Sequence, residues 1–152
     1  LFFVLASLVA CDDDAKKYTA EFPRFEPLQL KLAENELPKV GKAVVVEAPQ
    51  RKMGKHLYEV TYQWTVSGPA DAVQRYGKSN LYTERTPAPT DTITFSQSGR
   101  YNIVLVASYE VSGIGKGQSF TENFPAKMGS AKYDGSALRY RVTLERTIDV
   151  DD

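Results

Sequence analysis

Apolar and polar residues alternate with a period of two along most of this chain, which is the pattern of β-strands with one buried face. Leu28, Leu30 and Leu32 alternate with Gln29, Lys31 and Ala33. The longest alternation covers residues 56–67, where every second residue is aromatic or aliphatic. These residues are Tyr58, Val60, Tyr62, Trp64 and Val66. The pattern predicts that this face lies in the core and that the other face is largely exposed to water.

Further strands are predicted at 43–48, 92–96, 100–111 and 138–150. The first and third of these are apolar on both faces, which is typical of central strands. In the last strand the residues predicted to face inward are Leu138, Tyr140, Val142, Leu144, Ile148 and Val150. We find no convincing helical stripe. Six or seven strands with turn signals between them predict an all-β sandwich.

The connections between the predicted strands differ greatly in length. Residues 49–55 form a polar loop, and residues 68–90 form a long connection. Residues 112–136 contain five glycines and one proline. Because long structureless loops are uncommon, we expect either a hairpin through Gly115-Lys116-Gly117 or a short helix there. Asp134-Gly135 is typical of a turn.

The first fourteen residues do not follow the strand pattern. Ten uncharged, mostly apolar residues precede Cys11, the only cysteine of the chain, and Asp12, Asp13 and Asp14 follow it. This run is too short for a membrane-spanning helix, which needs about 20 residues, but it suits the apolar region of a signal peptide. The alternative is an N-terminal core strand containing Cys11. A core strand would not end in three aspartates, and a disulfide partner is missing.

Leu8-Val9-Ala10-Cys11 resembles the lipobox of bacterial lipoproteins. The resemblance implies cleavage before Cys11 and a diacylglycerol on its thiol, usually with an acyl chain on the new amine. An aspartate after the cysteine resembles the inner-membrane retention signal of enteric bacteria. An acidic run resembles the surface-export signal of Bacteroidetes lipoproteins, and three aspartates favour this second resemblance. The simpler interpretation is a solvated charged linker.

These signals divide the chain into a signal peptide (1–10), a lipidated cysteine with an acidic tether (11–24) and one domain (25–152). The expected location is the outer membrane, on the cell surface. The net charge is zero, with 19 basic and 19 acidic residues. This balance gives no bias toward nucleic acid. The expected contacts are the membrane, through the lipid, and a glycan or a partner protein.

Two stretches resemble the immunoglobulin-like domains of the PKD class. Residues 62–68 resemble the third strand of that family, with Trp64 as its buried tryptophan. Residues 92–106 resemble the run in which a strand ends, a glycine turn follows and a tyrosine, here Tyr101, opens the next strand. In this "tyrosine corner" the hydroxyl bonds to nearby backbone. The resemblance covers about residues 25–150 and implies a role in adhesion, spacing or binding.

Few residues of the chain could support catalysis. His56 is the only histidine, so with Cys11 lipidated a cysteine–histidine pair or a zinc site with several histidines is excluded. A Ser-His-Asp triad would need His56, for which a solvent-facing position is the simpler interpretation. A carboxylate pair for glycoside hydrolysis stays open. We expect no enzymatic activity, no cofactor and no metal, and a small hydrolase is the third hypothesis.

Aromatic residues in the predicted loops are the candidates for ligand contacts. They are Tyr76, Tyr82, Phe120, Phe124 and Tyr133. Alternatively, they pack beneath the loops in small clusters. Trp64 is assigned to the core because it shares a face with Val60 and Val66. The leading hypothesis is a non-catalytic binding module that uses loops 68–90 and 112–136. The alternative is a spacer or assembly subunit that pairs through an exposed edge strand.

Overall fold

The computed structural model describes residues 20–74, 86–111 and 118–152, and within these ranges the protein is all-β with no α-helix. The strands are antiparallel and form sheets of five, four and two strands, none of them closed. The strands are β1 (Arg24–Phe25), β2 (Gln29–Leu30), β3 (Ala43–Glu47), β4 (Gln50–Lys52), β5 (Leu57–Ser67), β6 (Ala72–Gln74), β7 (Thr90–Phe95), β8 (Gly99–Val111), β9 (Phe120–Asn123), β10 (Gly129–Asp134) and β11 (Arg139–Val150). The prediction of an all-β protein is confirmed.

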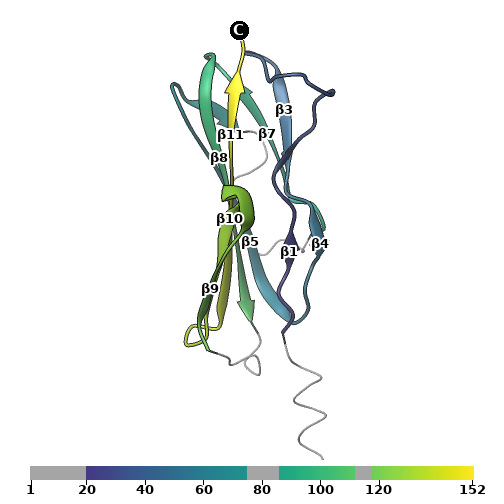
Figure 1. Ribbon diagram of the computed structural model, residues 1–152, viewed down its shortest axis with the longest axis vertical. Helices are drawn as coiled ribbons and strands as arrows, with labels where there is room; N and C mark the ends of the chain where they lie inside the picture. Colours follow the sequence, from purple (N-terminus) through teal and green to yellow (C-terminus); the bar gives the residue numbers. More distant parts are fainter. Residues whose placement is uncertain (1–19, 75–85, 112–117) are drawn as a thin grey trace, which may run out of the picture.

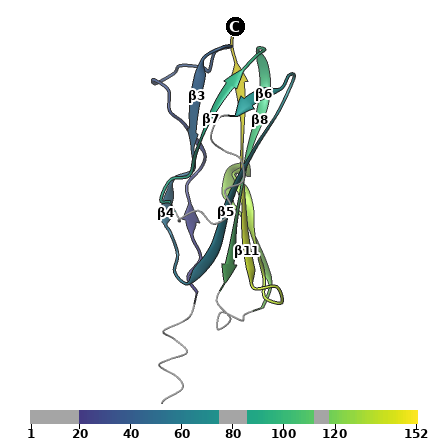
Figure 2. The same cartoon turned by 180° about the vertical axis from the view of Figure 1, so that it is seen from behind.

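The long strands β8 and β11 run along most of the elongated body (Figure 1). They lie inside the five-stranded sheet, whose order is β5-β8-β11-β10-β9. The four-stranded sheet, of order β2-β3-β7-β6, faces the half of this sheet nearest the C-terminus (Figures 1 and 2). The two-stranded sheet β1-β4 faces the other half. The N-terminal segment, here residues 20–28, begins at the end of the body opposite the C-terminus (Figure 1).

The facing sheets share one apolar core. Val46, Ile93 and Phe95 contribute to it from the four-stranded sheet, and all three have no exposed surface. Across the interface, the ring of Phe95 lies 4.6 Å from that of Tyr101 on β8. Burial of each such side chain contributes about 1.5–3 kcal/mol. The central positions predicted for strands 43–48 and 100–111 are confirmed, because β3 and β8 each have a neighbour on both sides.

A β-bulge changes the face assignment at the start of β5. The pairing of β5 with β8 shifts between Tyr58 and Thr61, and Glu59 has a φ of 43°. Because a bulge inserts one residue, it reverses the alternation on one side. Leu57 is therefore buried and Tyr58 is 53% exposed, so the inward prediction for Tyr58 is wrong. Beyond the bulge, Trp64 is buried as predicted.

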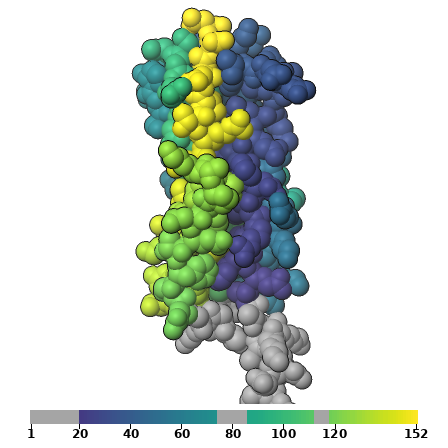
Figure 3. All heavy atoms as spheres, in the orientation of Figure 1, coloured from purple at the N-terminus to yellow at the C-terminus, as the bar shows by residue number. Residues whose placement is uncertain are grey.

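The connections also differ in part from the prediction. The polar loop at 49–55 contains the short strand β4, which pairs with β1. Strands β9 and β10 form a hairpin whose turn lies at 124–128, whereas residues 115–117 lie outside the described residues. The turn predicted at Asp134-Gly135 is confirmed, since Oδ1 of Asp134 accepts hydrogen bonds from two following backbone N–H groups. Figure 3 shows the hairpin lying along the N-terminal segment.

The hydroxyl of Tyr101 donates a 2.7 Å hydrogen bond to the backbone oxygen of Gln97, which confirms the predicted bond. Tyr101 is 1% exposed. We expect Tyr101→Phe to lower the free energy of unfolding by about 1 kcal/mol, because the Gln97 oxygen loses its donor. Urea denaturation measures the change, with the exposed Tyr58→Phe as the control. Equal stability of the two variants would contradict the prediction.

Candidate functional site

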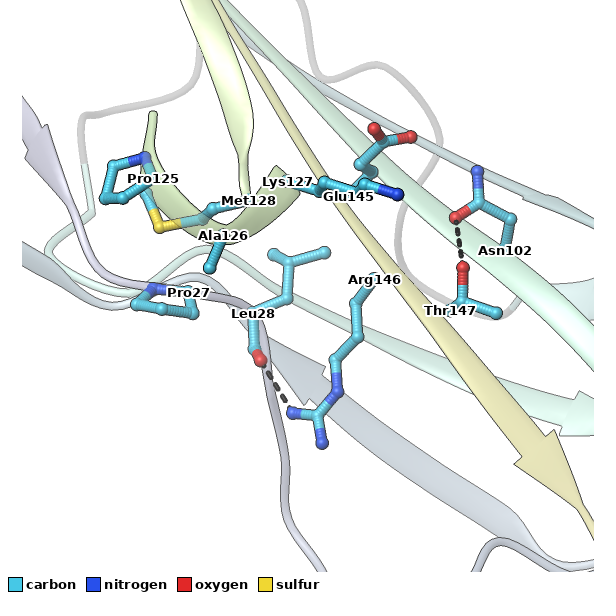
Figure 4. A pocket seen from close by; sticks show the side chains of 10 residues that line it. All are labelled: Pro27, Leu28, Asn102, Pro125, Ala126, Lys127, Met128, Glu145, Arg146 and Thr147. Carbon is cyan, nitrogen blue, oxygen red and sulfur yellow. Dashed lines mark hydrogen bonds between the residues drawn. The ribbon is translucent and has the colours of Figure 1, made fainter. Parts of the chain in front are cut away.

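Ten residues line an open groove of about 590 Å³ (Figure 4). Three segments that are far apart in the sequence form its walls. They are Pro27-Leu28 between β1 and β2, the hairpin turn Pro125–Met128, and residues Glu145, Arg146 and Thr147 of β11. Asn102 closes one end, where its side-chain oxygen accepts a 3.4 Å hydrogen bond from the Thr147 hydroxyl. The groove therefore depends on tertiary packing.

The hairpin turn that borders the groove has an unusual backbone. The N–H of Met128 donates a 3.1 Å hydrogen bond to the oxygen of Pro125. The two residues between them, Ala126 and Lys127, have φ values of 54° and 55°. This combination is typical of a type I′ turn, which favours asparagine and glycine. Each non-glycine residue in this conformation costs about 1–2 kcal/mol, so the sequence places strain beside the groove.

Replacing Ala126-Lys127 with Asn-Gly is expected to raise the free energy of unfolding by about 1–2 kcal/mol, because both residues tolerate the left-handed backbone. Urea denaturation provides the measurement. The matched control is Thr121→Gly in strand β9, which has no positive φ and should lose stability because glycine is more flexible when unfolded. A loss of stability in the Asn-Gly variant would contradict the strain at this turn.

Arg146 of the groove is missing from the inward-facing residues predicted for the strand at 138–150. It lies between the buried Leu144 and Ile148 on the inward face of β11, yet it is exposed. Its Nη1 donates a 2.7 Å hydrogen bond to the backbone oxygen of Leu28 (Figure 4). The arginine thereby attaches the segment between β1 and β2 to the five-stranded sheet. A charged residue at an inward position was the sequence signal for this site.

A second hollow of about 570 Å³ lies along the same contact between the hairpin and the N-terminal segment. It shares Pro27, Pro125 and Met128 with the groove and adds the rings of Phe25 and Phe124. Two ion pairs border it. Arg51 lies 2.8 Å from Glu26, and Arg24 lies 3.4 Å from Glu122. Because these pairs lie at the exposed rim, they contribute little to stability.

Three of the predicted ligand-contact residues lie on or beside the β9–β10 hairpin. Phe124 is half-buried and lines the second hollow. Phe120 is 38% exposed and Tyr133 is 2% exposed. Both rings contact Phe22, at centroid distances of 5.6 and 5.1 Å. The structure therefore brings Phe120 and Tyr133 into one aromatic cluster beneath the N-terminal segment, and contact with a ligand stays a prediction for all three.

Tyr140 forms the base of this cluster. Its ring stacks on that of Phe22 at 4.3 Å. Burial raises the pKa of its hydroxyl to about 12, and the negative charge of Glu122 adds to this shift. In the unfolded chain a tyrosine titrates near pH 10. Between these values the unfolded state loses a proton that the folded state retains, so the contribution of Tyr140 to stability is lost as pH rises.

We therefore expect the urea midpoint of the wild-type protein to fall between about pH 10 and about pH 12. The Tyr140→Phe variant should show a weaker fall over this range, because it lacks the titrating group. Parallel pH profiles for the two proteins would contradict the burial of an uncharged Tyr140 hydroxyl.

Most of the remaining predicted site residues are not described by the structure. Cys11, Asp12, Asp13, Asp14, Tyr76 and Tyr82 lie outside the described residues. His56 precedes β5 and is half-buried, with a φ of 55°. These positions leave the predictions for lipidation, export and ligand contact as predictions.

One carboxylate pair lies on the outer face of the five-stranded sheet. A hydrogen bond with Glu110 raises the pKa of the Glu59 carboxyl, and charge repulsion from Glu110 adds to this effect. Glu59 is exposed, and neither carboxylate lines the grooves described above. The described ranges contain no cluster of three or more residues suited to metal binding. They also contain no helix that is long and apolar enough to cross a membrane.

No protein-family model, curated protein or solved structure matches this chain.

Proposed function

We propose that this protein is a lipid-anchored binding module on the surface of a Gram-negative, Bacteroidetes-type cell envelope and has no catalytic activity. The lipobox-like Leu8–Cys11 sequence and the three aspartates after it support the anchor and the location. We further propose that the domain is an immunoglobulin-like sandwich of the PKD class. The facing sheets, the buried Trp64 and the hydrogen bond of the Tyr101 hydroxyl support this assignment.

The groove of about 590 Å³ is the observation that carries the binding function. Its wall includes Pro125–Met128, which belong to the predicted long loop at 112–136. Within the described residues that line it, the apolar side chains are those of proline, leucine, alanine and methionine, without an aromatic ring. Sugar sites favour aromatic platforms, whereas extended protein segments bind in grooves with apolar pockets and charged rims. We therefore propose a partner protein, with a glycan as the alternative ligand.

In this proposal, charged groups at the rim of the groove select which partner segments bind. Lys127 and Glu145 are exposed and carry opposite charges. The N–H of Glu145 donates a 3.0 Å hydrogen bond to the backbone oxygen of Met128, and this bond attaches the turn that carries Lys127 to β11. A partner segment with an acidic and a basic residue around an apolar centre fits this arrangement.

Site-specific photocrosslinking on intact cells tests this function. A photoreactive amino acid replaces Lys127 at the groove, and the matched control replaces Thr65, an exposed residue on β5 away from it. We expect a protein adduct from position 127 and none from position 65. A panel of envelope and dietary glycans is tested in parallel. Adducts of equal yield at both positions, or binding only to a glycan, would contradict a protein partner in the groove.

The alternative function is assembly through an edge strand. Strand β9 forms one edge of the five-stranded sheet, and all four of its residues are exposed. Such an edge can add a strand from another chain. Sedimentation velocity over a range of concentrations tests this alternative. It predicts oligomers that grow with concentration, and a monodisperse monomer at high concentration would count against it.

A further inference from the structure

Three basic side chains line a small hollow on the outer face of the five-stranded sheet, away from the groove. Lys132 on β10 lies directly opposite Arg141 on β11 in the strand register, and Arg139 lies two residues before Arg141 on the same face. Asp134 and Ala137 complete the lining of this hollow, whose volume is about 150 Å³. We call it the basic hollow. It brings two cations together across neighbouring strands.

Like charges directly opposite each other destabilise a strand pair. In the described part of the chain, five other basic residues form ion pairs: Arg24, Lys31, Arg51, Lys55 and Arg100. Within the same ranges, no ion pair involves Lys132, Arg139 or Arg141. The three cations of the basic hollow therefore lack the close ion pairs that these other cations form, although the charge of Lys132 acts on Asp134 and that of Arg139 acts on Glu59.

The nearby carboxylates are engaged with other groups. Oδ1 of Asp134 accepts N–H bonds of 2.9 Å from Ser136 and 3.1 Å from Ala137. The hydrogen bond from Ala137, followed by that from Ser136, lowers the pKa of the Asp134 carboxyl. The positive charge of Lys132 lowers this pKa further by a smaller amount. In the register, Arg139 lies between Asp134 on β10 and Glu110 on β8, and Glu110 is hydrogen-bonded to Glu59. Arg141 instead lies between Lys132 and Ser108, so the repulsion in the basic hollow is that between Lys132 and Arg141.

Arg139 is oriented by the sheet. Its Nη1 donates a 3.4 Å hydrogen bond to the hydroxyl of Ser108 on β8. An arginine fork can bind an oxyanion through two parallel hydrogen bonds, and a lysine acts as a compact charge beside it. We propose that the basic hollow binds a single tetrahedral oxyanion, a phosphate or sulfate ester, between Lys132 and Arg141. The oxyanion belongs to a lipid headgroup or to a sugar, and it removes the repulsion between the two strands.

Titration with inorganic sulfate and phosphate tests the site, with amide NMR signals as the readout. We expect saturable shifts confined to residues 132–141, and no such shifts with chloride at equal ionic strength. Lys132→Ala and Arg141→Ala should each weaken binding about tenfold. Arg100→Ala is the matched control, because Arg100 is on the same sheet and is paired with Asp149. Equal affinity in all three variants would overturn the proposal.

The melting temperature of the Lys132→Glu variant gives a second test, in which the expected result is a gain of stability rather than a loss. This change replaces a repulsive pair by an attractive one, so the melting temperature without anion should rise by about 1–3 °C. Sulfate should raise the melting temperature of the wild-type protein more than that of the variant. A variant that is less stable and responds equally to sulfate would contradict the site.

Two further titrations separate the sources of the oxyanion. One uses phosphatidylglycerol vesicles, compared with phosphatidylcholine vesicles, and the other uses a sulfated disaccharide. Binding that requires Lys132 and Arg141 supports the site in either titration and identifies a lipid headgroup or a sugar ester as its source. Binding that is equal in the wild-type protein and the double alanine variant in both titrations would overturn the proposal.

Discussion

Replacing Gly129 with alanine is expected to destabilise the protein by about 3–5 kcal/mol. Gly129 begins β10 directly after the strained turn and has a φ of 142°, which favours glycine. A Cβ at this position would overlap the backbone oxygen of Thr143 on the neighbouring strand β11. Because the obstacle is backbone, β10 and the hairpin turn would have to move together.

Gly41→Ala is the matched control for this change. Gly41 also has a positive φ, 75°, but an added Cβ there would meet no atom within 4 Å. Its expected cost is therefore only the conformational strain of about 1–2 kcal/mol. Urea denaturation of both variants separates strain from overlap. A Gly129→Ala variant as stable as Gly41→Ala would contradict the close approach of β10 to β11.

Replacing Trp64 with alanine should lower the free energy of unfolding by about 3–5 kcal/mol. Trp64 is 4% exposed and pairs with Leu105 of the central strand β8. Removal of the indole leaves a cavity between the facing sheets that rigid strands cannot refill. The result decides between the core and a sugar platform as the role of this residue.

Thr65→Ala provides the control, because Thr65 is the next residue and points to the exposed face. Its stability should lie within about 0.5 kcal/mol of the wild-type protein. Chemical denaturation and binding to a glycan panel are measured on both variants. A Trp64→Ala protein that keeps its stability but loses sugar binding would contradict the core assignment.

Period-two alternation predicted the core because each strand faces the core with every second residue. It placed Leu144 and Ile148 on the inward face correctly. It failed at Tyr58 because the bulge at Glu59 adds a residue without a recognisable sequence signal. Strand β4 was missed because its three residues are polar and two of them are exposed.

The groove could not be predicted from the sequence because it is a product of packing. Pro27, Pro125 and Arg146 come from three distant parts of the chain. Only Arg146 carried a signal, as a charge in an inward position. The basic hollow could not be predicted from the sequence either, because Lys132 and Arg141 lie opposite each other only in the observed register of the β10–β11 hairpin.

The two proposed sites lie on different parts of the domain. The groove lies where the N-terminal segment meets the hairpin, and the basic hollow lies on the outer face of the five-stranded sheet. The anchor at Cys11 would hold both at the membrane, where two acyl chains give stable attachment. The anchor is therefore the central claim of the proposed function.

Intact mass spectrometry of the protein extracted from its own membranes tests this claim most directly. We expect a chain that begins at Cys11 and carries a diacylglycerol, with an acyl chain on its amine. The Cys11→Ser protein should lack this mass and leave the membrane fraction. An unmodified Cys11 that is still preceded by residues 1–10 would contradict the lipid anchor.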